Sequence, residues 1–187
     1  MDRKLGLSIA VLAAICLFFV GAGKQRTQRT QTVGQQAPSH AVAVIMPTEG
    51  NAAHGVVKFS QDGREVRVVA EIRGLDPGSK HGFHIHQFGD MTLPNGTSMG
   101  GHYNPRETDH ALPDKEMRHA GDLGNIEADA NGVARLDRTF TGFSLGRRGS
   151  VMGRGVVIHA LPDDGGQPTG NAGARIGYGV IGFANTE

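Results

Sequence analysis

Two histidines separated by a single residue are the first feature of this sequence that could do chemistry. They stand in the run Phe83-His84-Ile85-His86. On a β-strand, alternate side chains point to the same face, so both imidazoles would lie on one face while Phe83 and Ile85 face the core. Two such imidazoles form half of a metal site, although the same pair could simply be two solvated histidines.

Further groups of the same chemical kind follow along the chain. Within twenty-one residues stand His102, His110, His119 and Asp122, and His159 ends a later apolar run. Imidazole nitrogen and carboxylate oxygen without thiolate suit copper and zinc. Any one of these residues could instead cap a turn or bond a loop backbone, but six histidines with an aspartate favour a metal centre.

The elements that must position these side chains are β-strands. After Ser39 the sequence consists of short alternating runs rich in Val and Ile, separated by Gly, Asp, Asn and Pro, which is typical of an antiparallel β domain. The segments Gln61-Asp62-Gly63 and Ala130-Asn131-Gly132 suit tight hairpin turns. The expected strands are His40–Pro47, His54–Ser60, Arg64–Arg73, Lys80–Phe88, His119–Asp129, Gly132–Phe140, Gly155–Ala160 and Gly177–Ala184.

Two long segments interrupt the expected strands, Gly89–Arg118 and Leu161–Arg175. Both are rich in glycine and polar residues. Long loops in a compact domain usually carry function, so we expect these two to build the site.

Length and charge limit the remaining possibilities. The chain of 187 residues is long enough for one domain with a hydrophobic core. Residues 40–187, which we expect to form that domain, contain fourteen Lys and Arg against seventeen Asp and Glu, a net charge of about −3. This balance argues against a nucleic-acid partner.

The N-terminal residues differ in composition from the rest. Residues 1–23 join a charged start to an apolar run, residues 5–20, followed by small residues, which is typical of a signal peptide. An uncleaved anchor that tethers the chain to a membrane is the alternative, although the run is shorter than the roughly twenty residues needed to span. Residues 24–39 are expected to form a polar flexible linker. We therefore expect export, to a periplasm or the extracellular space.

Four runs of the sequence resemble the copper/zinc superoxide dismutase family. They are His81-Gly-Phe-His-Ile-His-Gln-Phe-Gly-Asp90, Gly101-His-Tyr-Asn-Pro105, His119-Ala-Gly-Asp-Leu-Gly-Asn125 and Gly170-Asn-Ala-Gly-Ala-Arg175. The resemblance extends in order through essentially all of residues 40–187. It implies an all-β fold, an eight-stranded Greek-key β-barrel or sandwich of immunoglobulin-like type with two long functional loops, which agrees with the expected strands.

The resemblance also implies a role for each polar side chain. Copper would be bound by His84, His86, His102 and His159, and zinc by His102, His110, His119 and Asp122. His102 would bridge both metals, since imidazole has two nitrogens. Asp163 would bond ligand histidines of both metals and fix their orientation. Arg175 would lie beside the copper and guide a small anion, whereas His40, His54 and His81 would be solvated or structural.

The implied reaction is the dismutation of superoxide to oxygen and hydrogen peroxide, in which copper alternately accepts and returns one electron. A copper-binding delivery or storage protein without turnover is the alternative, but a carrier has no need of an anion guide such as Arg175. A structural adhesion sandwich would be expected to lack some of the seven ligand positions.

Three features depart from the family pattern. A disulfide usually ties the first long loop to the last strand, but the matching positions are Gly96 and Tyr178. The second loop is shorter than in many members and lacks the Glu and Lys cluster proposed to steer the anion. The altered run Leu93-Pro94-Asn95 lies where many members dimerise, which leaves the oligomeric state open, a homodimer included.

Overall fold

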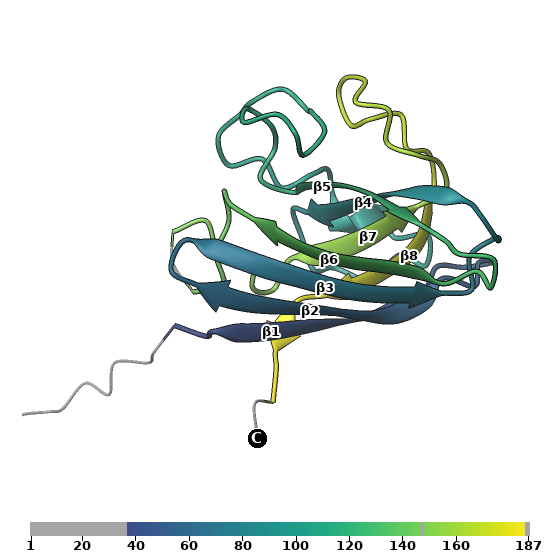
Figure 1. The fold of residues 1–187 in the computed structure, drawn as a ribbon, viewed down its shortest axis with the longest axis horizontal. Helices are drawn as coiled ribbons and strands as arrows, with labels where there is room; N and C mark the ends of the chain where they lie inside the picture. The colour runs from purple at the N-terminus through teal and green to yellow at the C-terminus, as the bar shows by residue number, and fades with distance from the viewer. Residues whose placement is uncertain (1–36, 147, 186–187) are drawn as a thin grey trace, which may run out of the picture. The chain divides into compact units, whose positions relative to one another are not determined.

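The computed structural model describes residues 37–146 and 148–185 (Figure 1). The predicted signal peptide, its alternative as a membrane tether and most of the predicted linker lie outside the described residues. Within the described ranges, no helix is both long enough and apolar enough to cross a membrane.

Strands form nearly all of the regular structure in the described part of the chain. They are β1 (His40–Pro47), β2 (His54–Asp62), β3 (Glu65–Arg73), β4 (Lys80–His86), β5 (Asp122–Glu127), β6 (Ala134–Phe140), β7 (Gly155–His159), β8 (Arg175–Val180) and β9 (Gly182–Phe183). A single turn of 3-10 helix, η1, covers Thr97–Met99.

The strands form because their apolar residues alternate with polar ones. In β3, alternate positions from Val66 to Ile72 are buried in the core, whereas Arg67 is exposed. In β4 buried residues do not alternate with exposed ones. Phe83 and Ile85 face the core, and His84 and His86, on the opposite face, are buried as well. Something must therefore cover the histidine face of β4.

The strands make an antiparallel barrel with the order β5-β4-β7-β8-β1-β2-β3-β6. The chain crosses from one side of the barrel to the other between β3 and β4 and again between β6 and β7, as in a Greek key. Strand β1 joins the two sides, because His40–Ile45 pair with β2 whereas Met46 and Pro47 pair with β8. The predicted eight-stranded β-barrel is confirmed, with an opening between β5 and β6, where only a bridge between Ala128 and Ala134 is described.

The last predicted strand, Gly177–Ala184, is two strands in the structure. The break falls at Ile181, whose N–H donates to the carbonyl of Arg154 at 2.9 Å and whose carbonyl accepts from the N–H of Gly153 at 2.8 Å. With its backbone bonded to this loop, Ile181 cannot join a ladder. The pairing partner therefore changes at this residue: β8 pairs with β7, whereas β9 pairs with β1.

The strand predicted over His119–Asp129 begins only at Asp122. The N–H of Asp122 donates to the carbonyl of His119 at 3.2 Å, so the residues before β5 form a turn. This turn places His119 and Asp122 close together, which an extended strand would not do.

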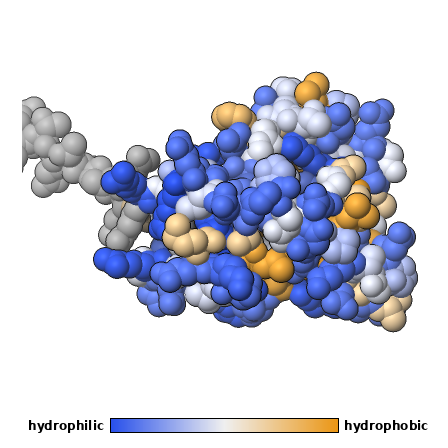
Figure 2. Space-filling view, turned by 90° about the horizontal axis from the view of Figure 1, so that it is seen from above, coloured by the Kyte–Doolittle hydropathy of each residue, from blue (hydrophilic) through white to orange (hydrophobic). Residues whose placement is uncertain are grey.

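The two long connections, residues 87–121 and 160–174, extend from the same side of the barrel (Figure 1). The first is fixed to β4 by its own backbone, because the N–H of Tyr103 donates to the carbonyl of Ile85 and the N–H of Ile85 donates to the carbonyl of Gly121. The face on this side is mostly hydrophilic, with small apolar spots (Figure 2). These connections cover the histidine face of β4.

Non-covalent contacts hold the first connection at the place where the family usually has a disulfide. Gly96 and Tyr178 are neighbours as expected, since a Cβ at Gly96 would lie 3.6 Å from Cδ2 of the Tyr178 ring. Tyr178 packs with Met99 of η1 and Val157 in a small apolar cluster separate from the main core. The guanidinium of Arg175 also donates to the carbonyl of Gly96.

We predict that Tyr178→Ala lowers the free energy of unfolding by about 3 kcal/mol, because it removes a buried aromatic ring and leaves a cavity. Met117→Ala is the control: Met117 is 69% exposed, and its loss should change stability by no more than about 0.5 kcal/mol. Urea denaturation of the metal-loaded protein measures both values. Equal stabilities of the two variants would show that the Tyr178 cluster does not hold the loop.

Candidate metal centre

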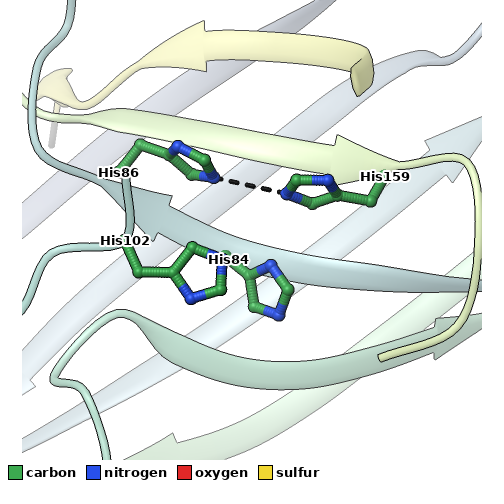
Figure 3. A group of neighbouring side chains, drawn as sticks. All are labelled: His84, His86, His102 and His159. Atoms are coloured by element: carbon green, nitrogen blue, oxygen red, sulfur yellow. Dashed lines mark hydrogen bonds between the residues drawn. The ribbon is translucent and has the colours of Figure 1, made fainter. Parts of the chain in front are cut away.

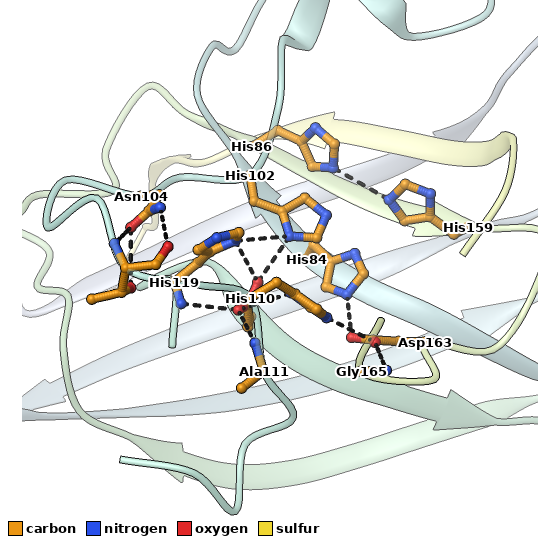
Figure 4. A network of polar contacts seen from close by, with 12 residues as sticks. His84, His86, His102, Asn104, His110, Ala111, His119, His159, Asp163 and Gly165 are labelled. Atoms are coloured by element: carbon orange, nitrogen blue, oxygen red, sulfur yellow. Dashed lines mark hydrogen bonds and ion pairs between the residues drawn. The ribbon is translucent and has the colours of Figure 1, made fainter. Parts of the chain in front are cut away.

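Seven buried side chains from distant parts of the chain, three of them on the first long connection, meet at the histidine face of β4 (Figures 3 and 4). They form two groups that could hold metal ions, His84, His86, His102 and His159 in one and His102, His110, His119 and Asp122 in the other. Within each group the ligand atoms all lie within 4.8 Å of one another. His102 belongs to both groups.

The first group brings together two neighbouring strands and the first connection (Figure 3). His84 and His86 come from β4, His159 is the last residue of β7, and His102 lies opposite His86 in an isolated bridge. The Nε2 atoms of His86 and His159 are 3.3 Å apart, and the ring centroids of His84 and His102 are 4.1 Å apart. Four imidazoles thus face one small space.

The second group is arranged around the carboxylate of Asp122, the first residue of β5. Its Oδ1 lies 2.8 Å from Nδ1 of His102 and 3.2 Å from Nδ1 of His119. Its Oδ2 lies 3.0 Å from Nδ1 of His110. The Nδ1 atoms of His119 and His102 are themselves 3.4 Å apart.

These separations and the unpaired atoms fit two metal ions. Two ligand atoms at about 2.05 Å from a tetrahedral ion lie roughly 3.3 Å apart, close to the values in both groups. In addition, three buried nitrogens make no hydrogen bond of normal geometry in the described structure, Nδ1 of His84, Nε2 of His102 and Nδ1 of His110, although the last lies 3.0 Å from Oδ2 of Asp122. Buried polar atoms are almost always paired, and a cation in each group would satisfy all three.

Hydrogen bonds on the outer side of each ring direct the other nitrogen inward. Nδ1 of His86 donates to the carbonyl of Gly100 at 2.9 Å, and Nδ1 of His159 donates to the carbonyl of Gly173 at 3.1 Å. Because a carbonyl only accepts, both Nδ1 atoms carry the proton and both Nε2 atoms keep a free lone pair. That is the form in which imidazole binds a metal.

The carboxylate of Asp163 accepts such outer hydrogen bonds from one ring of each group (Figure 4). Its Oδ2 lies 2.9 Å from Nε2 of His84, and its Oδ1 lies 2.9 Å from Nε2 of His110. The side-chain amide of Asn125 donates to the carbonyl of Asp163 and accepts from its N–H, which holds Asp163 in place. Gly170, at φ 78°, must be glycine here, since a Cβ would collide with the Asp163 carboxylate.

Burial makes several of the rings poor bases. Desolvation is the main cause that lowers the pKa of His102 to about 4 and the pKa of His159 to about 3. Both rings therefore stay neutral at physiological pH, so His159 need lose no proton to bind one metal, whereas His102 must lose its remaining N–H proton to bind two. Burial also lowers the pKa of His110, but the carboxylates of Asp122 and Asp163 outweigh it and raise that pKa to about 9.

The two carboxylates remain ionised although they are buried. Desolvation opposes ionisation of Asp122 and Asp163, but the histidines bonded to each carboxylate outweigh it and lower both pKa values. The second group therefore combines negative charge with imidazole, whereas the first contains imidazole alone.

Arg175, the first residue of β8, lies beside the first group. Its guanidinium donates to the carbonyl of Gly100, the same oxygen that accepts from His86. Burial and the neighbouring histidine rings are the larger causes that lower the pKa of His86 and of His159, and the positive charge of Arg175 lowers both pKa values further. The structure thus brings Arg175 to the group for which it was predicted.

The other histidines are placed differently. His81 is buried, with Nδ1 2.7 Å from the carbonyl of His159 and Nε2 2.6 Å from Oγ of Ser79, and it belongs to neither group. His40 and His54 are exposed. The support that Asn125 gives to Asp163 was not predicted from the sequence, although Asn125 ends one of the four runs that resemble the family.

Comparisons with known proteins agree with this geometry. The family model of copper/zinc superoxide dismutase (SODC) matches residues 53–181. The extracellular superoxide dismutase [Cu-Zn] of Drosophila melanogaster is 40% identical over 193 residues, which cover 98% of this chain and 99% of the relative. Superoxide dismutase [Cu-Zn] 3 of Arabidopsis thaliana is 45% identical over 77% of this chain and 92% of its own length.

A third relative, the extracellular superoxide dismutase [Cu-Zn] of Brugia pahangi, is 43% identical over 75% of this chain and 74% of its own length. Among solved structures, that of the clock protein EA4 has a TM-score of 0.74 and 39% identity, over 81% of this chain and 98% of that one. The chain belongs to the copper/zinc superoxide dismutase family.

Proposed function

We propose that this protein dismutates superoxide to oxygen and hydrogen peroxide with bound copper and zinc. The observation that carries the proposal is His102, a single ring that belongs to both candidate metal-binding groups. A copper delivery or storage protein has less support, because the relatives are named as dismutases and Arg175 lies beside the first group.

The donor sets indicate which metal each group takes. Four imidazoles suit copper, so we assign it to His84, His86, His102 and His159. Three imidazoles and a carboxylate suit zinc, so we assign it to His102, His110, His119 and Asp122. When bound, copper supplies one-electron redox chemistry and zinc supplies a fixed positive charge.

The chain's own residues prepare this centre for a small anion. His102 offers Nε2 as the atom at which a proton can be held between the two groups, while its Nδ1 stays beside Asp122. Arg175 brings a positive charge to the first group, and its bonds to the carbonyls of Gly96 and Gly100 keep the guanidinium in place. A fixed guanidinium attracts an anion without itself being a ligand.

We also propose that the protein is exported, with residues 1–23 as the signal peptide. Relatives named as extracellular in Drosophila melanogaster and Brugia pahangi support this proposal. A membrane tether through residues 5–20, the choice between periplasm and extracellular space, and a homodimer stay predictions.

We predict that His84→Ala and His159→Ala each abolish superoxide dismutation and remove copper, because each deletes one of four ligands. His54→Ala is the matched control, since His54 is exposed and belongs to neither group. Metal analysis and a superoxide assay on the reconstituted protein measure both effects. Full activity of either ligand variant, or wild-type protein that binds copper without turnover, would favour the carrier.

For Asp163→Asn we expect metal affinity to fall by about 10–100-fold. An amide has one acceptor oxygen, so it cannot accept from both His84 and His110 as the carboxylate does. Asp164→Asn changes the same charge on the exposed neighbouring residue and should leave affinity unaltered. Competition with metal chelators compares the two variants, and equal affinities would contradict the bridging role.

Arg175→Ala should slow turnover while copper and zinc contents stay at wild-type levels, because the guanidinium is not a ligand. Arg175→Lys keeps the charge and should retain more of the rate. Rising salt should slow the wild type more than Arg175→Ala, since screening limits charge to a range of about 8 Å at physiological ionic strength. Identical rates and salt responses in the wild type and Arg175→Ala would rule out a guiding role.

A further inference from the structure

A pocket opens on the outer side of the second group. Its volume is about 380 Å³, and its walls come from the turn before β3, the first long connection and the residues after β6. The lining residues that matter here are Arg64, Arg106, Glu116, Arg118, His119 and Thr141.

The pocket gathers more positive than negative side chains. Three arginines line it against one glutamate, and none of the three takes part in an ion pair within the described ranges. Three arginines of β3 and β6, by contrast, are ion-paired: Arg67 with Asp137, Arg73 with Glu71, and Arg135 with Glu71 and Asp129. A pocket with this charge should attract anions.

One of the arginines has a buried donor without an acceptor. Nη1 of Arg118 donates to the carbonyl of Lys115 at 2.8 Å, but Nε is buried and has no partner in the described structure. Leaving a buried charged donor unpaired costs free energy, so the arrangement indicates a missing acceptor. The three other buried atoms in this condition all belong to the metal-binding groups.

His119 indicates the same missing acceptor. Its Nδ1 faces Asp122 and His102, whereas no hydrogen bond of its Nε2 is described within residues 37–146 and 148–185. The outer nitrogens of His84, His86, His110 and His159 all have an acceptor in the protein. A histidine that binds a metal almost always donates its other N–H, and at His119 the pocket is where that acceptor would lie.

We propose that this pocket binds a small tetrahedral oxyanion of the phosphate class, whose oxygens accept from the three arginines and from Nε2 of His119. A phosphate suits the site better than a carboxylate, because its additional oxygens can accept from donors that converge from several directions. The contact with His119 rests on the proposed zinc site, whereas the anion site itself rests on the arginines alone.

Isothermal titration of the full, metal-loaded chain with inorganic phosphate tests the site. We expect the wild type to bind one phosphate per chain. The double variant Arg64→Gln/Arg106→Gln should bind phosphate about tenfold more weakly, because hydrogen bonds between charged groups are stronger than those between neutral groups. Both arginines are exposed, so the fold should tolerate the change. Arg73→Gln alters the same kind of charge at the opposite end of β3 and should bind like the wild type.

A parallel titration with glycerol 3-phosphate distinguishes two sources of the same chemistry. Tighter binding of the ester would identify an organic phosphate as the ligand, and tighter binding of inorganic phosphate would identify the free ion. No phosphate binding by the wild type, or equal binding by the double variant and Arg73→Gln, would overturn the proposal.

The contact with His119 has its own readout. Because coupling between two ligands is reciprocal, phosphate should raise zinc affinity in a chelator competition, by about tenfold for a contact of this kind. The double variant should lose this effect. Zinc affinity unchanged by saturating phosphate would remove His119 from the anion site. Dismutase activity enters neither measurement, so a failure here is distinct from a failure of the proposed function.

Discussion

The structure depends on keeping six imidazoles and two carboxylates buried in one place. Each of these groups must be paired, because an isolated polar group within a barrel costs free energy. The protein meets most of this demand itself, through the carbonyls of Gly100 and Gly173 and through Asp163, which contacts rings of both groups. The buried ring nitrogens that it leaves unpaired all belong to the two metal-binding groups, so the incomplete hydrogen bonding of these rings is itself the binding site.

This demand explains why the site needs the whole fold. His84 and His86 are far from Asp122 and His159 in the sequence but close to both in space, because β4 lies between β5 and β7 in the barrel. The chain must cross the barrel twice to bring these strands together. The long connections then add His102 and Asp163 from above the sheet, so the ligand sets are completed only when barrel and connections are both in place.

Much of this could be predicted from local sequence patterns. Alternation along β1 and β3 indicates strands, and the histidine pair on β4 indicates two ligands on one face, because both patterns depend on neighbouring residues. The break at Ile181 was not predicted, since it depends on bonds to Gly153 and Arg154 far back in the chain. The support that Asn125 gives to Asp163 was missed for the same reason: the two residues meet only in the folded barrel.

The opening between β5 and β6 has a consequence for how molecules of this protein meet in concentrated solution. Strand β6 pairs with β3 on one side, and on the other no strand is described beyond the bridge at Ala134. An unpaired strand edge can recruit the same edge of another molecule and start aggregation. Along β6, however, Arg135, Asp137 and Arg138 are exposed. Their charges disfavour edge-to-edge stacking, so the barrel can stay open at this seam while the protein remains dispersed.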